Sequence, residues 1–324
     1  MDMKTTYMGL ELKNPIIVSS SKLTSTIDNI RKCADHGAGA IVLKSLFEEQ
    51  LLADANKLMD KDEKYFWYPE AVDYINQHSK DFGVKEYLEL LTEAKKYTTI
   101  PIIASINCVS ADEWPKFARN LEEAGADGIE LNIAIIPMTG DISSKEVEDK
   151  YVEIIQEVKK YTSLPVSVKF GPLFTNPVNI IQRMDEAGAD ALVIFNRFYR
   201  PDINIHTESV VHNNILSGPE EMTQSLRWVS LLSDKVKCDV AANTGIHDAE
   251  GMIKQLLGGA DAVQICSTLY SNGISYIDTM LGDLKTWMEE HNYDSIGDFK
   301  GKIARDNEHA AAFARVQFMK RNQN

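Results

Sequence analysis

Polar and basic side chains stand at the ends of several short apolar runs in this sequence. Lys44 follows one run, in VLKS, and Lys169 follows another, in SVKF. An unpaired ammonium is costly in a protein interior, so each lysine requires an anionic ligand or a carboxylate such as Glu130. Further runs end in Ser19, Ser20, Ser21, Asn107, Asn132 and Asn196. Converging hydroxyls, amides and lysines suit the pyrimidine edge of a flavin, whose anionic reduced ring a lysine can stabilise.

Two loops rich in small residues have the character of a phosphate site. One apolar run ends in ANTGI at residues 242–246, and another ends in Cys266, Ser267 and Thr268 before a helical pattern. Small residues allow a close approach of the backbone, and a helix N-terminus favours an anion. Each loop alone is equally well explained as a glycine turn or a helix cap. Their occurrence together favours phosphate binding.

The elements that position these residues form a repeated pattern. A helix tail, Gly-Ala and an apolar strand recur at residues 36–45, 124–133, 187–196 and 258–267. Other short apolar runs cover residues 14–20, 100–107, 164–170 and 238–245. Eight strands, with long helical patterns between the later ones, predict an α/β fold of the closed (β/α)8 TIM-barrel type rather than an open doubly wound sheet. The active site is then expected at the C-terminal ends of the strands.

Several segments lie outside the barrel pattern. Residues 5–14 alternate around a glycine and predict a hairpin that plugs the N-terminal end of the barrel. Long insertions follow the second strand, at 46–85, and the sixth, at 197–222. Insertions of this length on the functional face cover an active site or make a subunit contact. The chain is predicted to form a single domain over residues 1–324, with a C-terminal helical segment from about 275 to 324.

Composition excludes several classes of protein. The 324 residues are 44% hydrophobic and 25% charged, as in soluble globular proteins. The 34 Lys and Arg residues against 48 Asp and Glu residues give a formal charge of −14. A surface this acidic repels polyanions, which argues against nucleic acid or an anionic membrane as the main partner.

The cysteines and the N-terminus predict a reduced, cytoplasmic protein. Cys33, Cys108, Cys238 and Cys266 form no Cys-x-x-Cys pair, so we expect structural thiols and no metal centre. The apolar run Pro15–Val18 is too short to cross a bilayer, and no signal-peptide pattern accompanies it.

The order of these motifs resembles the FMN barrel of class 1 dihydroorotate dehydrogenases over nearly the whole chain. The matching segments are NPIIVSSS, VLKS, ELNIAIIP, VKFGP, FNR, LSGP, ANTGI, VQICSTLY and SIGDFKGKI. The resemblance implies an FMN-dependent oxidoreductase, homodimeric, that converts dihydroorotate to orotate in pyrimidine biosynthesis. The sequence has no cysteine cluster that would indicate an iron–sulfur partner, which favours a soluble small electron acceptor. Carried over by position, the residues around FMN would be Ser19, Ser20, Lys44, Ser45, Asn132, Lys169, Asn196, Ser217, Gly218, Asn243, Thr244, Gly245, Cys266 and Ser267. Lys44 and Lys169 would flank the isoalloxazine, and the last five would hold the phosphate.

The sequence departs from that family where the substrate would lie. In the family the fourth strand ends Asn-x-Ser-Cys-Pro-Asn, in which Cys is the catalytic base and the last Asn binds the pyrimidine. Here residues 132–137 read NIAIIP, so Ile135 takes the place of the base and cannot accept a proton. YFWYPE at 65–70 replaces an Asn-rich stretch, and Arg197 replaces a serine. The substrate-facing positions have therefore changed more than the flavin-facing ones.

If the reaction is unchanged, another group must accept the substrate proton. The candidates are Tyr65, Tyr68, Glu70, Tyr199 and His206, and histidine has the most suitable unperturbed pKa. Loop residues of these types are more often surface or packing residues. Arg197 could bind a substrate carboxylate or form a structural ion pair with Asp202. We predict catalytic roles for Lys44, Arg197, Tyr68 and His206.

Other functions fit parts of the sequence. A flavin oxidoreductase for another small carboxylated or cyclic substrate would keep the cofactor site. A non-redox enzyme acting on sugar phosphates would use the same phosphate loops, with Lys169 as a Schiff-base residue. Loss of the base would also fit a non-catalytic flavin-binding relative. Dihydrouridine synthases share an FMN barrel, but they need a basic surface for RNA that a charge of −14 disfavours.

Overall fold

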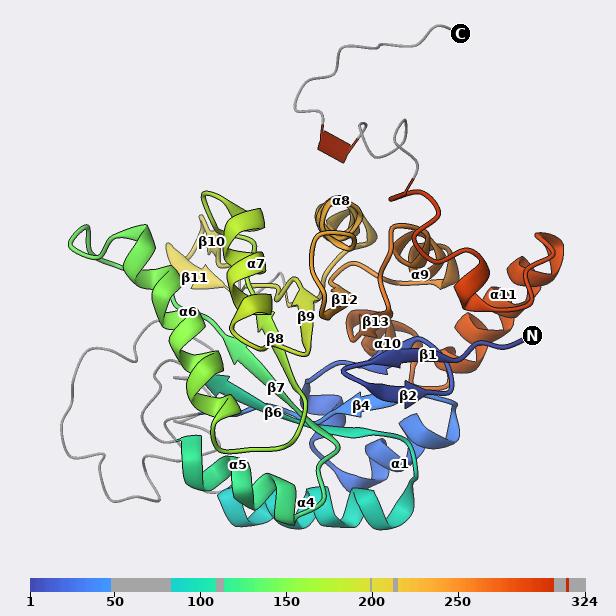
Figure 1. Cartoon of the computed structure of the whole chain (residues 1–324), viewed down its shortest axis with the longest axis horizontal. Helices are drawn as coiled ribbons and strands as arrows, with labels where there is room; N and C mark the ends of the chain where they lie inside the picture. The colour runs from blue at the N-terminus through green and yellow to red at the C-terminus, as the bar shows by residue number, and fades with distance from the viewer. Residues whose placement is uncertain (48–82, 109–113, 199, 212–214, 306–312, 315–324) are drawn as a thin grey trace, which may run out of the picture.

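The computed structural model describes residues 1–324 except 48–82, 109–113, 199, 212–214, 306–312 and 315–324. Within the described residues, eight parallel strands form a closed ring with helices on its outside (Figure 1). The ring strands are β3 (Ile16–Val18), β4 (Ala40–Val42), β6 (Ile102–Cys108), β7 (Gly128–Ile133), β8 (Val166–Phe170), β9 (Ala191–Ile194), β12 (Asp239–Asn243) and β13 (Ala262–Ile265).

The pairing of these strands confirms the predicted barrel. The hydrogen-bonded order is β4, β3, β13, β12, β9, β8, β7 and β6, and pairing of β4 with β6 closes the ring. A short further strand, β5 (Leu46–Phe47), continues the chain beyond β4 and also pairs with β6. All eight predicted runs contain a ring strand, so the carboxyl ends of the strands meet at one end of the barrel.

The Gly-Ala repeats share one conformation. Each begins with a glycine after a helix, and in the described structure these glycines have φ of +93° at Gly37, +90° at Gly125, +100° at Gly188 and +107° at Gly259. Glycine adopts this left-handed conformation without the penalty that a Cβ imposes, which is why it ends helices so often. The repeated glycine therefore turns the chain from each helix into the next strand.

Aspartate completes three of these repeats. Asp127 accepts a hydrogen bond from Ile102 N at 2.7 Å and pairs with Lys95 at 2.6 Å. The same arrangement ties Asp190 to Val166 N and Lys159, and ties Asp261 to Val240 N and Lys300. Each aspartate thus joins the start of its own strand to the start of the preceding one.

The N-terminal hairpin closes the opposite end of the barrel, as predicted. Strands β1 (Thr5–Tyr7) and β2 (Leu10–Leu12) are antiparallel. Tyr7, Met8 and Leu12 are buried in a cluster with residues that point into the barrel. These barrel residues are Ile17, Ala40, Val42, Ile103, Ala191, Val193, Ala241 and Ala262. The apolar plug leaves the carboxyl ends of the strands as the end that can hold a polar site.

Helices cover the outside of the ring (Figure 1). They are α1 (Ile27–Asp35), α4 (Val84–Tyr97), α5 (Trp114–Glu123), α6 (Ser144–Lys159), α7 (Pro177–Glu186), α8 (Met222–Leu232), α9 (Ala249–Leu257), α10 (Ser267–Asn272) and α11 (Tyr276–Glu290). Short 3-10 turns occur at η1 (Lys22–Thr24), η3 (Pro219–Glu221) and η4 (Ile296–Asp298). The buried residues of these helices and the outward-facing strand residues form the main core.

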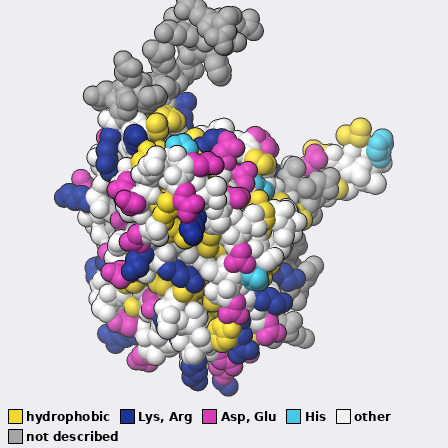
Figure 2. All heavy atoms as spheres, turned by 90° about the vertical axis from the view of Figure 1, so that its right-hand side faces the viewer, with side chains coloured by type: hydrophobic (Ala, Val, Ile, Leu, Met, Phe, Trp, Pro, Cys, Tyr) yellow, Lys and Arg dark blue, Asp and Glu magenta, His cyan; other side chains and the backbone are white. Residues whose placement is uncertain are grey.

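The two predicted insertions are described to different extents. Most of 46–85 lies outside the described residues. The insertion after β9 contains a hairpin, β10 (Asp202–Asn204) and β11 (Ser209–Val211), which the sequence did not predict. Figure 2 shows this hairpin as the narrow arm that extends from the body.

The surface seen in Figure 2, which carries α9 and α11, has lysines and arginines dispersed among acidic side chains. This face offers no continuous basic area of the kind that binds nucleic acid. Among the described helices, none is both long and apolar enough to cross a membrane.

Candidate active site

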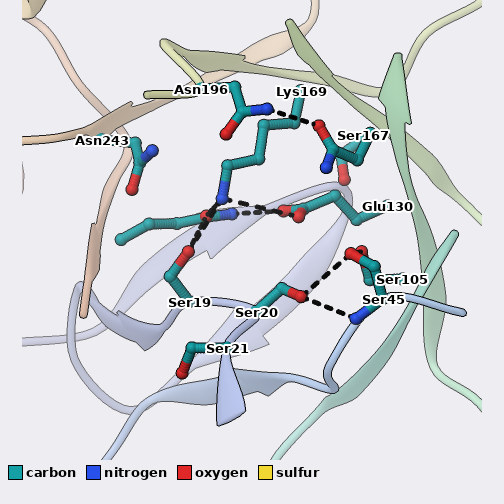
Figure 3. Close-up of polar contacts among 12 residues, drawn as sticks. Ser19, Ser20, Ser21, Ser45, Ser105, Glu130, Ser167, Lys169, Asn196 and Asn243 are labelled. Carbon is teal, nitrogen blue, oxygen red and sulfur yellow. Dashed lines mark hydrogen bonds and ion pairs between the residues drawn. The ribbon is translucent and has the colours of Figure 1, made fainter. Parts of the chain in front are cut away.

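A hydrogen-bonded network surrounds Lys169 inside the carboxyl end of the barrel (Figure 3). Lys169, on β8, donates from Nζ to Ser19 Oγ at 2.8 Å and to Gln264 Oε1 at 3.1 Å. Gln264, on β13, donates from Nε2 to Glu130 Oε2 at 2.5 Å. Glu130 Oε1 lies 3.8 Å from Lys169 Nζ. All four residues are buried, and they come from four different strands or strand ends of the ring.

The network fixes the lysine and leaves capacity for a ligand. An ammonium has three N–H bonds, of which Ser19 and Gln264 accept two. Glu130 provides the negative charge near Lys169, as the sequence analysis considered. Within the described structure, its Oε1 accepts no hydrogen bond. The site therefore presents a charge-compensated lysine with a donor for a polar ring edge, which fits a flavin.

A chain of serines supports the neighbouring strand ends. Ser20 Oγ lies 3.0 Å from Ser45 Oγ and accepts a hydrogen bond from Ser45 N at 2.9 Å. Ser45 Oγ lies 2.8 Å from Ser105 Oγ on β6. This chain holds the residue next to Lys44. Burial, together with the charge of Lys22, lowers the pKa of Lys44 to about 8, so a substantial neutral fraction exists near that pH.

Two further amides meet over the end of β8. Asn196, which follows β9, donates from Nδ2 to Asn132 Oδ1 on β7 at 2.9 Å. Asn243, at the end of β12, donates from Nδ2 to Phe195 O at 2.7 Å, and Thr244 Oγ1 donates to the same oxygen at 3.0 Å. The ends of β7, β9 and β12 are thus linked by polar side chains.

The predicted phosphate loops meet at Ser217. Ser217 N and Ser217 Oγ both lie 3.0 Å from Ser267 Oγ at the start of α10, and Gly245 N donates to Ser217 Oγ at 3.3 Å. Cys266, which precedes α10, makes no side-chain capping bond to that helix. Hydroxyls and amides from three loops therefore converge at one point, and this donor set fits a phosphate.

Backbone conformation marks the same point. Thr244 and Gly245 have φ of +76° and +78°. Left-handed backbone is costly for a β-branched residue and is concentrated at functional sites. A Cβ on Gly245 would lie 2.2 Å from Met222 N, a backbone atom of α8 that has little room to move. Glycine is required here both for φ and for the close approach.

Replacing Gly245 with alanine is expected to destabilise the flavin-free protein by about 1–3 kcal/mol from left-handed backbone strain alone, with the contact to Met222 adding to this. Urea unfolding measures the change. Gly282→Ala is the control, because that glycine lies in α11 with open space around it and should gain about 0.5–1 kcal/mol. Equal stability of Gly245→Ala and the wild type would contradict the requirement for glycine.

The structure places the predicted catalytic residues in different surroundings. Arg197 Nε donates to both carboxylate oxygens of Glu221, at 3.2 and 3.0 Å, so its partner is not the Asp202 that the sequence suggested. His206 lies exposed in the turn between β10 and β11, where its backbone N donates to Asn204 Oδ1. Tyr65, Tyr68, Glu70 and Tyr199 lie outside the described residues.

Arg197 also borders a cavity of about 310 Å³. Asn196, Phe198, Arg200, Gln224 and Thr244 line the same cavity. Two residues assigned to FMN binding, Asn196 after β9 and Thr244 after β12, therefore line this cavity.

Two members of the site, Gln264 and Glu221, were not predicted from the sequence. Gln264 is a polar residue inside an otherwise apolar strand, and this pattern is the signal that could have revealed it. Glu221 follows Ser217 and Gly218 by only a few residues, but nothing in the sequence indicates that its carboxylate turns back to Arg197.

Ile135, in the position of the family's base, follows β7 and is partly buried against the main core. Its amide donates to Tyr151 Oη at 3.4 Å. The side chain adds apolar surface against the core and no titratable group.

Comparison with known proteins identifies the family. A model of the family described as dihydroorotate dehydrogenase matches residues 2–288. Three relatives, from Thermoplasma volcanium, Thermoplasma acidophilum and Methanocella arvoryzae, are each named dihydroorotate dehydrogenase B (NAD(+)), catalytic subunit. They are 28%, 26% and 29% identical to this chain over 93%, 94% and 88% of its length and 98%, 99% and 92% of their own.

These matches confirm the predicted enzyme class, an FMN-dependent oxidoreductase acting on CH–CH groups. They agree with the barrel, whose polar carboxyl end has the donors that a flavin and its phosphate require. The chain belongs to the dihydroorotate dehydrogenase family.

Proposed function

We propose that this protein oxidises a carbon–carbon single bond in a small cyclic carboxylated substrate of the dihydroorotate class and delivers the electrons through FMN to a soluble acceptor. The observation that carries this proposal is the buried Lys169 network at the carboxyl ends of the strands, next to a convergence of phosphate-type donors. The names of the relatives specify NAD(+), which makes a soluble nicotinamide acceptor the first to test.

The residues proposed to bind FMN fall into two groups. Those proposed for the isoalloxazine ring are Ser19, Ser20, Lys44, Ser45, Asn132, Lys169 and Asn196. Those proposed for the phosphate end are Ser217, Gly218, Asn243, Thr244, Gly245, Cys266 and Ser267. Bound FMN would supply a hydride acceptor at N5 and a reduced ring that carries negative charge. The protein's contribution is to hold that ring against Lys169, whose position Ser19 and Gln264 fix.

The proton removed from the substrate requires an acceptor other than residue 135. Of the residues assigned to catalysis that the structure describes, Lys44 lies two residues after β4, next to Ser45, and its pKa is lowered to about 8. His206 is exposed on the β10–β11 arm. We therefore assign the proton to Lys44, which can accept it only in the neutral form.

Anaerobic addition of dihydroorotate to the flavin-loaded protein tests this proposal. Flavin absorbance should bleach within seconds, and addition of NAD(+) or another soluble acceptor should restore it. A yellow protein that stays oxidised would exclude dihydroorotate as the reductant. A protein that binds no FMN would contradict the whole assignment.

We further propose that the enzyme is a cytoplasmic homodimer in which the β10–β11 arm packs against a second copy. Ile203, Ile205 and Val210 on this arm are 67%, 78% and 62% exposed. A two-stranded hairpin with apolar residues in water is marginally stable, and an isologous contact would bury the same residues from both copies.

Ile203→Asp is expected to convert the dimer to a monomer, because it places a charge on the face that Ile203 shares with its cross-strand partner Val210. Light scattering after gel filtration measures the mass. Ser209→Asp adds the same charge to the other face of the arm and should remain dimeric. A monomeric wild type, or a dimeric Ile203→Asp variant, would contradict this interface.

A further inference from the structure

Glu221 is a nearly buried carboxylate at the junction of two loops. It ends η3 immediately before α8, and its side chain is 9% exposed. Oε1 accepts hydrogen bonds from Gly218 N at 3.0 Å and from Arg197 Nε at 3.2 Å. Oε2 accepts from Arg197 Nε at 3.0 Å and lies 2.9 Å from Arg200 Nη2.

The charge of this carboxylate is stabilised in place. Burial by itself raises the pKa of Glu221, but the hydrogen bonds from Arg197 and Gly218 and the two guanidinium charges outweigh burial and lower it. Glu221 is therefore anionic at neutral pH. An anion held by three donors from two loops forms a strong, charge-assisted junction between those loops.

One of the joined loops carries the phosphate-type donors. Ser217 precedes Gly218 and makes the contacts to Ser267 and Gly245 that bring three loops together. His247 Nε2 lies 2.7 Å from Ser217 O. These contacts hold Ser217 from the side of β12 and β13, while Glu221 holds the adjacent amide from the side of β9.

Arg197 provides the second half of the junction. It follows Asn196 at the end of β9, and its Nη1 donates to Ile215 O at 3.3 Å. Arg197 and Glu221 together thus fasten the backbone at residues 215 and 218, on both sides of Ser217, to the end of β9.

We propose that Glu221 is a positioning residue for the cofactor phosphate: with Arg197 it holds Ser217 in the conformation that binds the phosphate of FMN. The inference rests on the proposed function and extends it to a residue that contacts no ligand. Gly218 N is engaged by Glu221, so Gly218 contributes to the site through its position and not as a phosphate donor.

Selectivity between FMN and riboflavin tests this inference, because the two flavins differ only in the phosphate. The flavin-free wild type should bind FMN far more tightly than riboflavin in a fluorescence titration. Glu221→Gln should weaken FMN binding by about tenfold or more, as expected when a hydrogen bond to a charged group is disturbed, and should change riboflavin binding less than twofold. A purely structural role would weaken both equally.

Two further variants make the test specific. Glu93→Gln removes a charge from an exposed residue of α4, on the opposite side of the barrel from η3, and should change neither affinity. Arg197→Gln breaks the junction from the other side and should reproduce the loss of FMN selectivity, which covers the case in which Glu221→Gln does not fold. Unchanged selectivity in the folded Glu221→Gln or Arg197→Gln variant would overturn the inference alone. A wild type that binds neither flavin would overturn the proposed function as well.

Discussion

Replacing Lys169 with methionine is expected to slow reduction of the bound flavin about 10²–10³-fold, the usual effect of removing a preorganised donor from a site where negative charge develops. Lys169 is the cation that the network of Ser19 and Gln264 holds at the carboxyl end of the barrel. Stopped-flow absorbance measures the rate. The flavin reduction potential should also fall, and this second readout does not depend on the identity of the substrate.

The control for this variant must also remove the charge of Glu130. Removing Lys169 alone leaves a fully buried carboxylate without its cation, which typically costs about 3–5 kcal/mol. The double variant Lys169→Met/Glu130→Gln removes both charges and keeps the contact to Gln264. The double variant should fold and bind FMN, but its bound flavin should still be reduced slowly. Wild-type rates and potential in the double variant would show that Lys169 does not act on the flavin.

Replacing Ile135 with cysteine is expected to speed flavin reduction by dihydroorotate about 10²–10⁴-fold, the range that a positioned general base contributes. Ile135 follows β7 in the place of the family's base, while the flavin-facing residues are kept. The reduction rate under anaerobic conditions measures the gain.

The matched control is Ile135→Ala, which removes the same packing against the core without adding a thiol. The pH dependence separates the two bases. In the wild type the rate should rise with pH and level off above about 8, because Lys44 accepts a proton only when neutral. In the cysteine variant the pH dependence of the rate should instead follow ionisation of the thiol. Equal rates for the cysteine and alanine variants would show that position 135 does not face the reacting carbon.

The barrel was predictable because its signals are local and repeated. The left-handed glycines at the helix ends and the aspartates that tie one strand start to another produce Gly-Ala-Asp in the sequence itself. The strand-end lysine and serines were predictable for a related reason, since the carboxyl ends of parallel strands must meet. The strand order alone therefore places this lysine and these serines at the same end of the barrel.

The remaining features of the site depend on loop geometry that the sequence does not encode locally. Arg197 pairs with Glu221 and not with Asp202 because η3 brings residue 221 back toward β9. Asn196 and Asn132 bond to each other over the end of β8, although either could equally have faced solvent. The β10–β11 arm carries apolar residues on a hairpin whose strands are too short for a clear alternating pattern.

A crystal structure of the protein with FMN bound would locate the cofactor directly. We expect the phosphate against Ser217, Gly245 and Ser267, and the pyrimidine edge of the flavin within hydrogen-bonding distance of Lys169 Nζ. A flavin bound away from the carboxyl ends of the strands, or no flavin at saturating concentration, would contradict it.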